Sequence, residues 1–69
     1  MTNRIISDVH ICGGEPSVKG TRIPVKVVLS HLAAGDTMDD LMKDFPNLTQ
    51  EDIRACFEYA SYLATEHVA

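Results

Sequence analysis

The side chains most able to carry out chemistry in this 69-residue chain are three histidines and two cysteines. They are His10, His31, His67, Cys12 and Cys56. No histidine stands at a spacing that would pair it with a serine, cysteine or carboxylate as nucleophile and base. Because so short a chain also leaves little room for a deep pocket, we expect no catalytic residue, no enzymatic activity and no cofactor.

Metal binding is equally weak as a prediction. Cys12 and His10 are close enough in sequence to share a metal ion, but a strong zinc site uses four ligands at recognisable spacings. The two cysteines also lack the CxxC spacing, so we predict two reduced thiols and no metal site. Cys56 falls on a predicted apolar helix face and is expected in the core, whereas His31 is expected at the surface or an interface.

Phosphate binding is limited by charge and by motif. The segment VKGT lacks the lysine after a second glycine that a nucleotide-binding loop requires. Up to Gly35 the chain has four basic and two acidic residues, and from Asp36 onward two basic and eight acidic, which gives +2 and −6 and a net −4. Either these are solvated surface charges, or any nucleic acid contacts mainly the first half and the isolated protein binds DNA weakly. The candidate DNA-binding residues are Arg4, Lys19, Arg22, Lys26, Gln50 and Arg54.

Arg22 and its neighbour Thr21 allow two interpretations. In the structural one, Thr21 hydrogen-bonds its own turn, and Arg22 pairs with a carboxylate such as Asp8 or Glu15. In the functional one, the planar guanidinium of Arg22 binds a phosphate or an acidic site on a partner. The structural interpretation is favoured.

The elements that must position these side chains begin with a short β unit. Residues 4–11, RIISDVHI, are rich in β-branched side chains and predict a strand, with SVKG, residues 17–20, as its partner. Glycines between and after the strands permit positive φ and bend the chain back. The predicted structural turn residues are Gly13, Gly14, Pro16, Gly20 and Thr21.

Three helices are predicted to follow, over about residues 24–34, 38–45 and 50–66. Pro24 suits the first turn of the first helix and Gly35 suits its end. Thr37 is a good N-cap for the second helix, which Pro46 ends. Thr49 and Asp52 form a capping box at the start of the third. The buried stripe predicted for this last helix is Ile53, Cys56, Phe57, Ala60 and Ala64.

The predicted architecture is a mainly α, homeodomain-like or winged helix-turn-helix three-helix bundle with a short N-terminal β element. The second and third helices form the helix-turn-helix pair, although the third begins with acidic residues, which leave Gln50 and Arg54 as candidates for base contact. Tyr59, Tyr62 and Leu63 extend the apolar surface round a second side of this helix and predict a partner or homodimer interface. The competing expectation is that the β element covers that side.

We expect one domain over residues 1–69, with the β element and glycine-rich turn in 1–23 and the helices in 24–66. No apolar run approaches the roughly 20 residues that cross a bilayer, and the first residues lack the apolar stretch of a signal peptide. The expected location is therefore the cytoplasm, without membrane contact.

The segment GGEPSVKGTRIPV and the helical part AAGDTMDDLMKDFPNLTQEDIRACFEYA resemble the bacterial family called domain of unknown function 433. The spacing of Gly14, Pro16, Gly20, Thr21 and Arg22 is its most distinctive feature, and the resemblance covers about residues 5–62. It implies a compact helix-turn-helix fold and similarity to antitoxins of type II toxin-antitoxin pairs, often encoded beside a nuclease-like toxin.

Three functions follow as alternatives. The first is an antitoxin-like protein that binds a nuclease-like toxin and, as a complex, represses its own operon. The second is a small DNA-binding regulator without a toxin partner, and the third is a dimeric structural module that touches no nucleic acid. Because the sequence stops at Ala69 without the extended tail common in antitoxins, toxin binding would use the folded surface.

Overall fold

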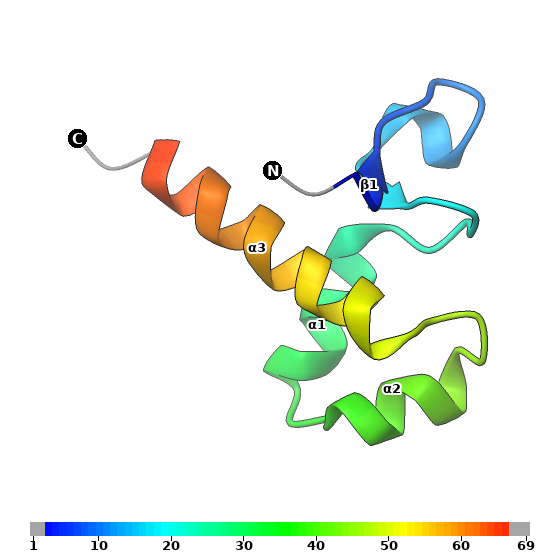
Figure 1. Ribbon diagram of the computed structural model, residues 1–69, viewed down its shortest axis with the longest axis vertical. Helices are drawn as coiled ribbons and strands as arrows, with labels where there is room; N and C mark the ends of the chain where they lie inside the picture. Colours follow the sequence, from blue (N-terminus) through cyan, green and yellow to red (C-terminus); the bar gives the residue numbers. More distant parts are fainter. Residues whose placement is uncertain (1–2, 67–69) are drawn as a thin grey trace.

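A computed structural model describes residues 3–66 of the chain. A small antiparallel sheet precedes three helices, and the last helix is the longest element (Figure 1). The elements are β1 (Ile5–Ile6), a 3-10 turn η1 (Cys12–Gly14), β2 (Ser17–Val18), α1 (Val25–Ala33), α2 (Met38–Asp44) and α3 (Gln50–Glu66). The predicted mainly α three-helix fold with a short N-terminal β element is confirmed.

The β element is smaller than the prediction of a strand over residues 4–11. Ile5 pairs with Val18 and Ile6 with Ser17 in a two-stranded sheet, and Pro24 adds one antiparallel bridge to Ser17. After Ile6 the chain turns, because Asp8 accepts hydrogen bonds from the backbone N–H of His10 at 2.9 Å and, through its carbonyl, from that of Ile11 at 2.8 Å. The strand prediction is therefore wrong beyond Ile6.

A tight turn links β2 to the segment that leads into α1. The backbone N–H of Thr21 donates to the Val18 carbonyl at 3.0 Å, and the Thr21 hydroxyl donates to the same oxygen at 2.7 Å. The hydroxyl also accepts from the N–H of Ile23 at 3.1 Å. Gly20 sits inside this turn with φ at +83°, where a side chain would strain the backbone. Thr21 thus satisfies its own turn, as the structural interpretation expected.

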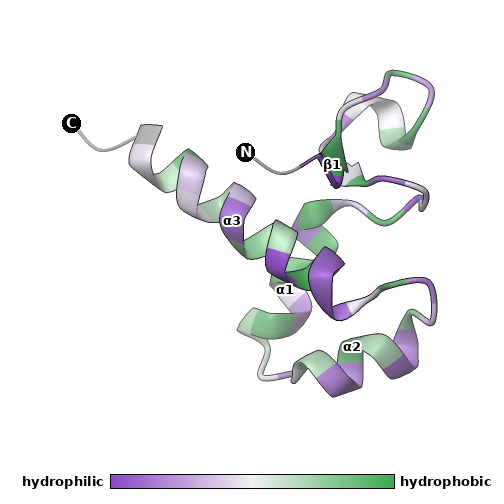
Figure 2. Cartoon of the chain, viewed as in Figure 1, coloured by the Kyte–Doolittle hydropathy of each residue, from purple (hydrophilic) through white to green (hydrophobic). Residues whose placement is uncertain are grey.

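The helix boundaries agree with the local signals in the sequence. Pro24 is the N-cap of α1, one position before the helix begins. At the start of α2, Thr37 and Asp40 form a capping box, and Thr49 and Asp52 form the predicted one at the start of α3. Purple and green alternate along α2 in Figure 2, as expected of a helix with one face on the core.

The core lies where the three helices and β2 meet. Its members are fully or almost fully buried: Val18, Val25, Val28, Leu41, Leu48, Ile53 and Cys56. On α3 the buried residues all lie in the first two turns, from Asp52 to Cys56. The carboxyl end of α3 extends past the other elements (Figure 1). The longest helix is therefore packed at one end and open at the other.

Candidate functional site

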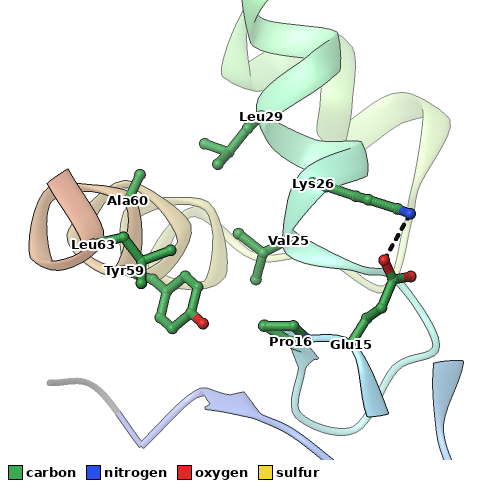
Figure 3. A pocket seen from close by; sticks show the side chains of 8 residues that line it. All are labelled: Glu15, Pro16, Val25, Lys26, Leu29, Tyr59, Ala60 and Leu63. Carbon is green, nitrogen blue, oxygen red and sulfur yellow. Dashed lines mark ion pairs between the residues drawn. The ribbon is translucent and has the colours of Figure 1, made fainter. Parts of the chain in front are cut away.

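An apolar groove lies between the start of α1 and the middle of α3, next to the loop that holds Pro16 (Figure 3). Its volume is about 320 Å³. The lining residues are Glu15, Pro16, Val25, Lys26, Leu29, Tyr59, Ala60 and Leu63. Because six of these eight side chains are apolar or aromatic, the groove suits an apolar segment of another molecule.

The groove exists because the core-facing stripe of α3 continues after the core ends. Ile53 and Cys56 fill the core, and the same face of the helix then carries Tyr59, Ala60 and Leu63 at intervals of three and four residues. Only the first turns of α1 stand opposite these later residues, so the gap between the two helices is not filled.

One rim of the groove is charged. The Lys26 ammonium lies 2.7 Å from a carboxylate oxygen of Glu15, and both side chains are largely exposed (Figure 3). An exposed ion pair of this kind adds little stability, on the order of 0–1 kcal/mol. It does give the groove a polar edge, which can fix the orientation of a bound segment.

The predicted interface residues are divided by the structure. Tyr59 packs partly against the core, and with Leu63 it lines the groove. Tyr62 lies outside the groove lining and is 46% exposed. The prediction that Phe57 and Ala64 belong to the buried stripe is wrong, because Phe57 is 48% exposed and Ala64 is also exposed. The buried stripe instead includes Tyr59, which packs against the core, whereas Phe57 faces away from the core.

The candidate DNA-binding residues are not equally available. Arg4 forms an ion pair with Asp52 at 3.0 Å, and Lys26 is bound to Glu15. Lys19 and Arg22 are exposed near the β element, and Gln50 and Arg54 are exposed on the first turns of α3. The first turn of α3 is purple in Figure 2, and it also carries the exposed Glu51. These residues do not add up to a basic face, since two of the five cationic side chains already have carboxylate partners.

The predicted carboxylate partners of Arg22 are wrong. Glu15 binds Lys26, and Asp8 caps its own turn, so neither carboxylate pairs with Arg22. Arg22 instead lines a hollow of about 440 Å³ of mixed polar and apolar character. Its other lining residues are Ile11, Gly20, Thr21 and Asn47, and residues 3–66 supply no ion pair to Arg22. The glycine-rich loop thus leaves this guanidinium at the surface.

The two thiols occupy different environments. Cys56 is fully buried in α3, and burial, assisted by the nearby Asp52 carboxylate, raises the pKa of its thiol to about 11. Cys12 is partly exposed, with φ at +53°, and its Sγ donates to the Arg22 carbonyl at 3.2 Å. His10 is exposed, and His67 lies outside the described residues. The core position predicted for Cys56 is confirmed.

Sequence reasoning missed three parts of the groove, namely Pro16, Val25 with Leu29, and Ala60 as a partly exposed lining residue. Val25 and Leu29 fit the apolar period of α1, which by itself does not indicate that they also line a groove. The available signal is length: α3 continues for ten residues after Cys56, whereas α1 spans only nine residues in all. Because α3 is longer than α1, the apolar stripe of α3 continues beyond the residues that α1 can cover.

Membrane insertion finds no support in the helices. No helix within residues 3–66 combines the length and the apolar character needed to span a bilayer.

The fold defines a small helical domain with an N-terminal β hairpin and a helix-turn-helix pair, α2 and α3. Residues 5–60 match the family described as protein of unknown function DUF433, and the chain belongs to this family. The predicted family resemblance is thereby confirmed.

Two relatives extend this result. The chain is 39% identical over 56 residues to the uncharacterized protein y4eO of Sinorhizobium fredii, an alignment that covers 81% of this chain and 25% of that protein. The crystal structure of a DUF433 member from Anabaena variabilis superposes with a TM-score of 0.84 at 29% identity, over 94% of this chain and 64% of that one. The chain therefore spans about a quarter of the first relative and under two thirds of the second.

Proposed function

We propose that this protein is an antitoxin-like interaction module that binds a nuclease-like toxin through the groove between α1 and α3. The observation that carries the proposal is the groove itself, an apolar hollow continuous with the core and bordered by one ion pair. A tyrosine in such a hollow is a typical anchor of protein recognition, because it offers a large apolar ring beside a polar rim, and Leu63 adds apolar area next to it. The proposed role is binding, without catalysis.

Charge supports a basic partner. From Asp36 onward the chain carries −6, and that region includes all of α2 and α3. A nuclease needs a basic surface to hold its phosphate substrate, so an acidic helical protein complements it electrostatically. Two free thiols, one of them buried, fit a reducing compartment, and we propose that the protein acts in the cytoplasm.

In this proposal, the complex of the protein with its toxin binds DNA, whereas the protein alone binds it weakly. Gln50 and Arg54 are exposed on the first turns of α3, where a helix-turn-helix protein presents side chains to the major groove. The neighbouring Glu51 and the ion pair between Arg4 and Asp52 reduce the net positive charge there. A toxin with its own basic surface would supply the missing phosphate contacts, so that only the complex represses its operon.

The test is co-purification of the protein with the product of the neighbouring reading frame. Leu63→Glu places a charge in the groove and is expected to weaken binding by at least about tenfold. Phe57→Glu is the matched control, because Phe57 is an exposed apolar residue of the same helix outside the groove. Calorimetry on the purified pair measures both affinities.

Three results contradict the proposal or redirect it. Equal loss of affinity in both variants means that the groove is not the docking site. A wild-type protein that self-associates in light scattering, and becomes monomeric with Leu63→Glu, makes the groove a homodimer interface and supports the structural module. Tight binding of operator DNA by the protein alone supports the stand-alone regulator.

A further inference from the structure

Three side chains with metal-ligating atoms meet at the carboxyl ends of α1 and α2. His31 is in the last turn of α1, Asp36 follows that helix, and Asp44 is the last residue of α2. One imidazole nitrogen and one oxygen from each carboxylate all lie within 4.8 Å of one another. This cluster has no part in the groove, whose α1 residues come from the amino end of that helix.

The turn after α1 fixes the first two members. The backbone N–H of Gly35 donates to the Leu32 carbonyl at 3.1 Å, and the N–H of Asp36 donates to the His31 carbonyl at 3.0 Å, with Gly35 at φ +102°. This is the Schellman arrangement that ends helices at a glycine. Because it bonds Asp36 to the backbone of His31, the two side chains leave the turn next to each other, with Nδ1 of His31 2.8 Å from Oδ2 of Asp36.

The imidazole ring is also held from the other side. Phe45 contacts it edge-on, with ring centroids 5.4 Å apart and an interplanar angle of 86°. Since Phe45 directly follows Asp44, the contact that fixes the ring also places the Asp44 carboxylate beside it. Neighbouring contacts therefore hold the three ligand side chains in place, and His31 and Asp36 are each about one third exposed.

The electrostatics of this corner favour a cation. The carboxyl ends of two helices, each carrying a partial negative charge, meet here beside two carboxylates. A carboxylate at the end of a helix, as Asp44 is, adds to the dipole's negative charge instead of compensating it. From Asp36 to Ile53 the only lysine or arginine is Lys43, and its interaction with a carboxylate is with Asp40 at the start of α2. Within residues 3–66, the ion pair found at this cluster is that of the His31 imidazole with Asp36.

We propose that His31, Asp36 and Asp44 form a binding site for a divalent transition-metal cation of the zinc type. The nitrogen donor favours zinc or cobalt over magnesium and calcium, which prefer oxygen alone. Donors around tetrahedral zinc stand about 3.3 Å apart when the metal–ligand bonds are about 2.0 Å. The His31–Asp36 pair, at 2.8 Å, therefore needs to open by about half an ångström, and donors as far as 4.8 Å apart need to close in by about 1.5 Å. The cation replaces the proton between Nδ1 of His31 and Oδ2 of Asp36, and a water or a partner's side chain completes the coordination.

The experiment is titration of the full chain with zinc chloride by isothermal calorimetry at pH 7, followed by cobalt absorption spectroscopy. The wild type is expected to bind one zinc ion saturably and to give the visible bands of a cobalt site with a nitrogen ligand. Asp44→Asn and His31→Gln are expected to weaken zinc binding at least about tenfold. Asp39→Asn is the matched control, an exposed acidic residue of the same helix outside the cluster, and should bind as the wild type does.

Circular dichroism checks that each variant is still folded. Because Asp44 is exposed, its replacement should leave the helices intact. Absence of saturable zinc binding overturns the proposal, and so does binding that Asp44→Asn leaves unchanged, since Asp44 would then not be a ligand. Zinc binding that Leu63→Glu does not affect supports a site independent of the groove. The proposed docking function and this site can therefore fail separately.

Discussion

The two halves of α3 belong to one continuous helix and yet differ in almost every physical respect. In residues 50–56 the side chains of Ile53 and Cys56 are fully buried, and Asp52 is hydrogen-bonded on both carboxylate oxygens. In residues 57–65 no side chain is fully buried, and Phe57, Tyr62 and Leu63 are 48%, 46% and 37% exposed. The first half holds the fold together, and the second presents apolar surface to whatever binds it.

This difference teaches that helical period alone does not locate a core. The apolar period runs through both halves, but the partner helix α1 is only nine residues long and faces the first half and the groove. At the amino end of α1, the same stripe changes from a stability element into a recognition element. The consequences of substitution should therefore change between Cys56 and Leu63.

The largest expected effect is on packing in the first half. Ile53→Ala should lower the free energy of unfolding by about 2–5 kcal/mol, because the side chain is fully buried and its loss leaves a cavity. Leu63→Ala removes a similar apolar group from a 37% exposed position and should cost less than about 1 kcal/mol. Urea unfolding followed by circular dichroism measures both. Equal losses in the two variants would break the comparison, since the second half would then be part of the core.

The next effect concerns the start of α3. Asp52 accepts from the Thr49 backbone N–H at 3.0 Å and from the Arg4 guanidinium at 3.0 Å, so Asp52→Asn turns an amide N–H₂ toward one of two donors. We expect a loss of about 1–3 kcal/mol, because the group is buried. The matched control is Asp40→Asn in the exposed capping box of α2, which should cost less. Thermal unfolding compares them, and a larger loss at Asp40 would contradict the ranking.

The smallest effect is a pH dependence at that exposed box. Hydrogen bonds from the Thr37 backbone N–H, and secondarily with its side chain, hold the pKa of Asp40 below 3.8 in the folded protein. A folded-state pKa below the unfolded one stabilises the protein above about pH 4, and this contribution is lost as the pH falls through the folded pKa. The difference in unfolding free energy between wild type and Asp40→Asn should thus shrink below pH 4. A difference that stays constant or grows there would contradict the assignment.

Much of the fold could be predicted from local sequence because its boundaries are set by local chemistry. Thr49 with Asp52, Thr37 with the aspartates that follow it, Pro24 and Gly35 each act within four residues of themselves. Hydrogen bonds between residues close in sequence can be predicted from the residue types and their spacing alone. The predicted helices accordingly begin and end within about one residue of the observed ones.

Features that depend on distant contacts could not be predicted in this way. Phe57 and Tyr59 both suit a helical stripe, and only the position of α1 decides that Tyr59 faces the core. The carboxylate partners of Arg4 and Lys26 likewise depend on the folded chain, since Arg4 binds a residue 48 positions away. The groove and the cluster around His31 arise at junctions between elements, which no single segment of sequence contains.

The burial of Cys56 has a practical consequence for the study of this protein. With a pKa of about 11 and no surface exposure, its thiol is closed to alkylating reagents while the chain is folded, whereas Cys12 is partly exposed. The native molecule should take up one label and the unfolded molecule two. The number of labels counted by mass spectrometry thus records how often α3 leaves the core, and the two native thiols report unfolding without any engineered cysteine.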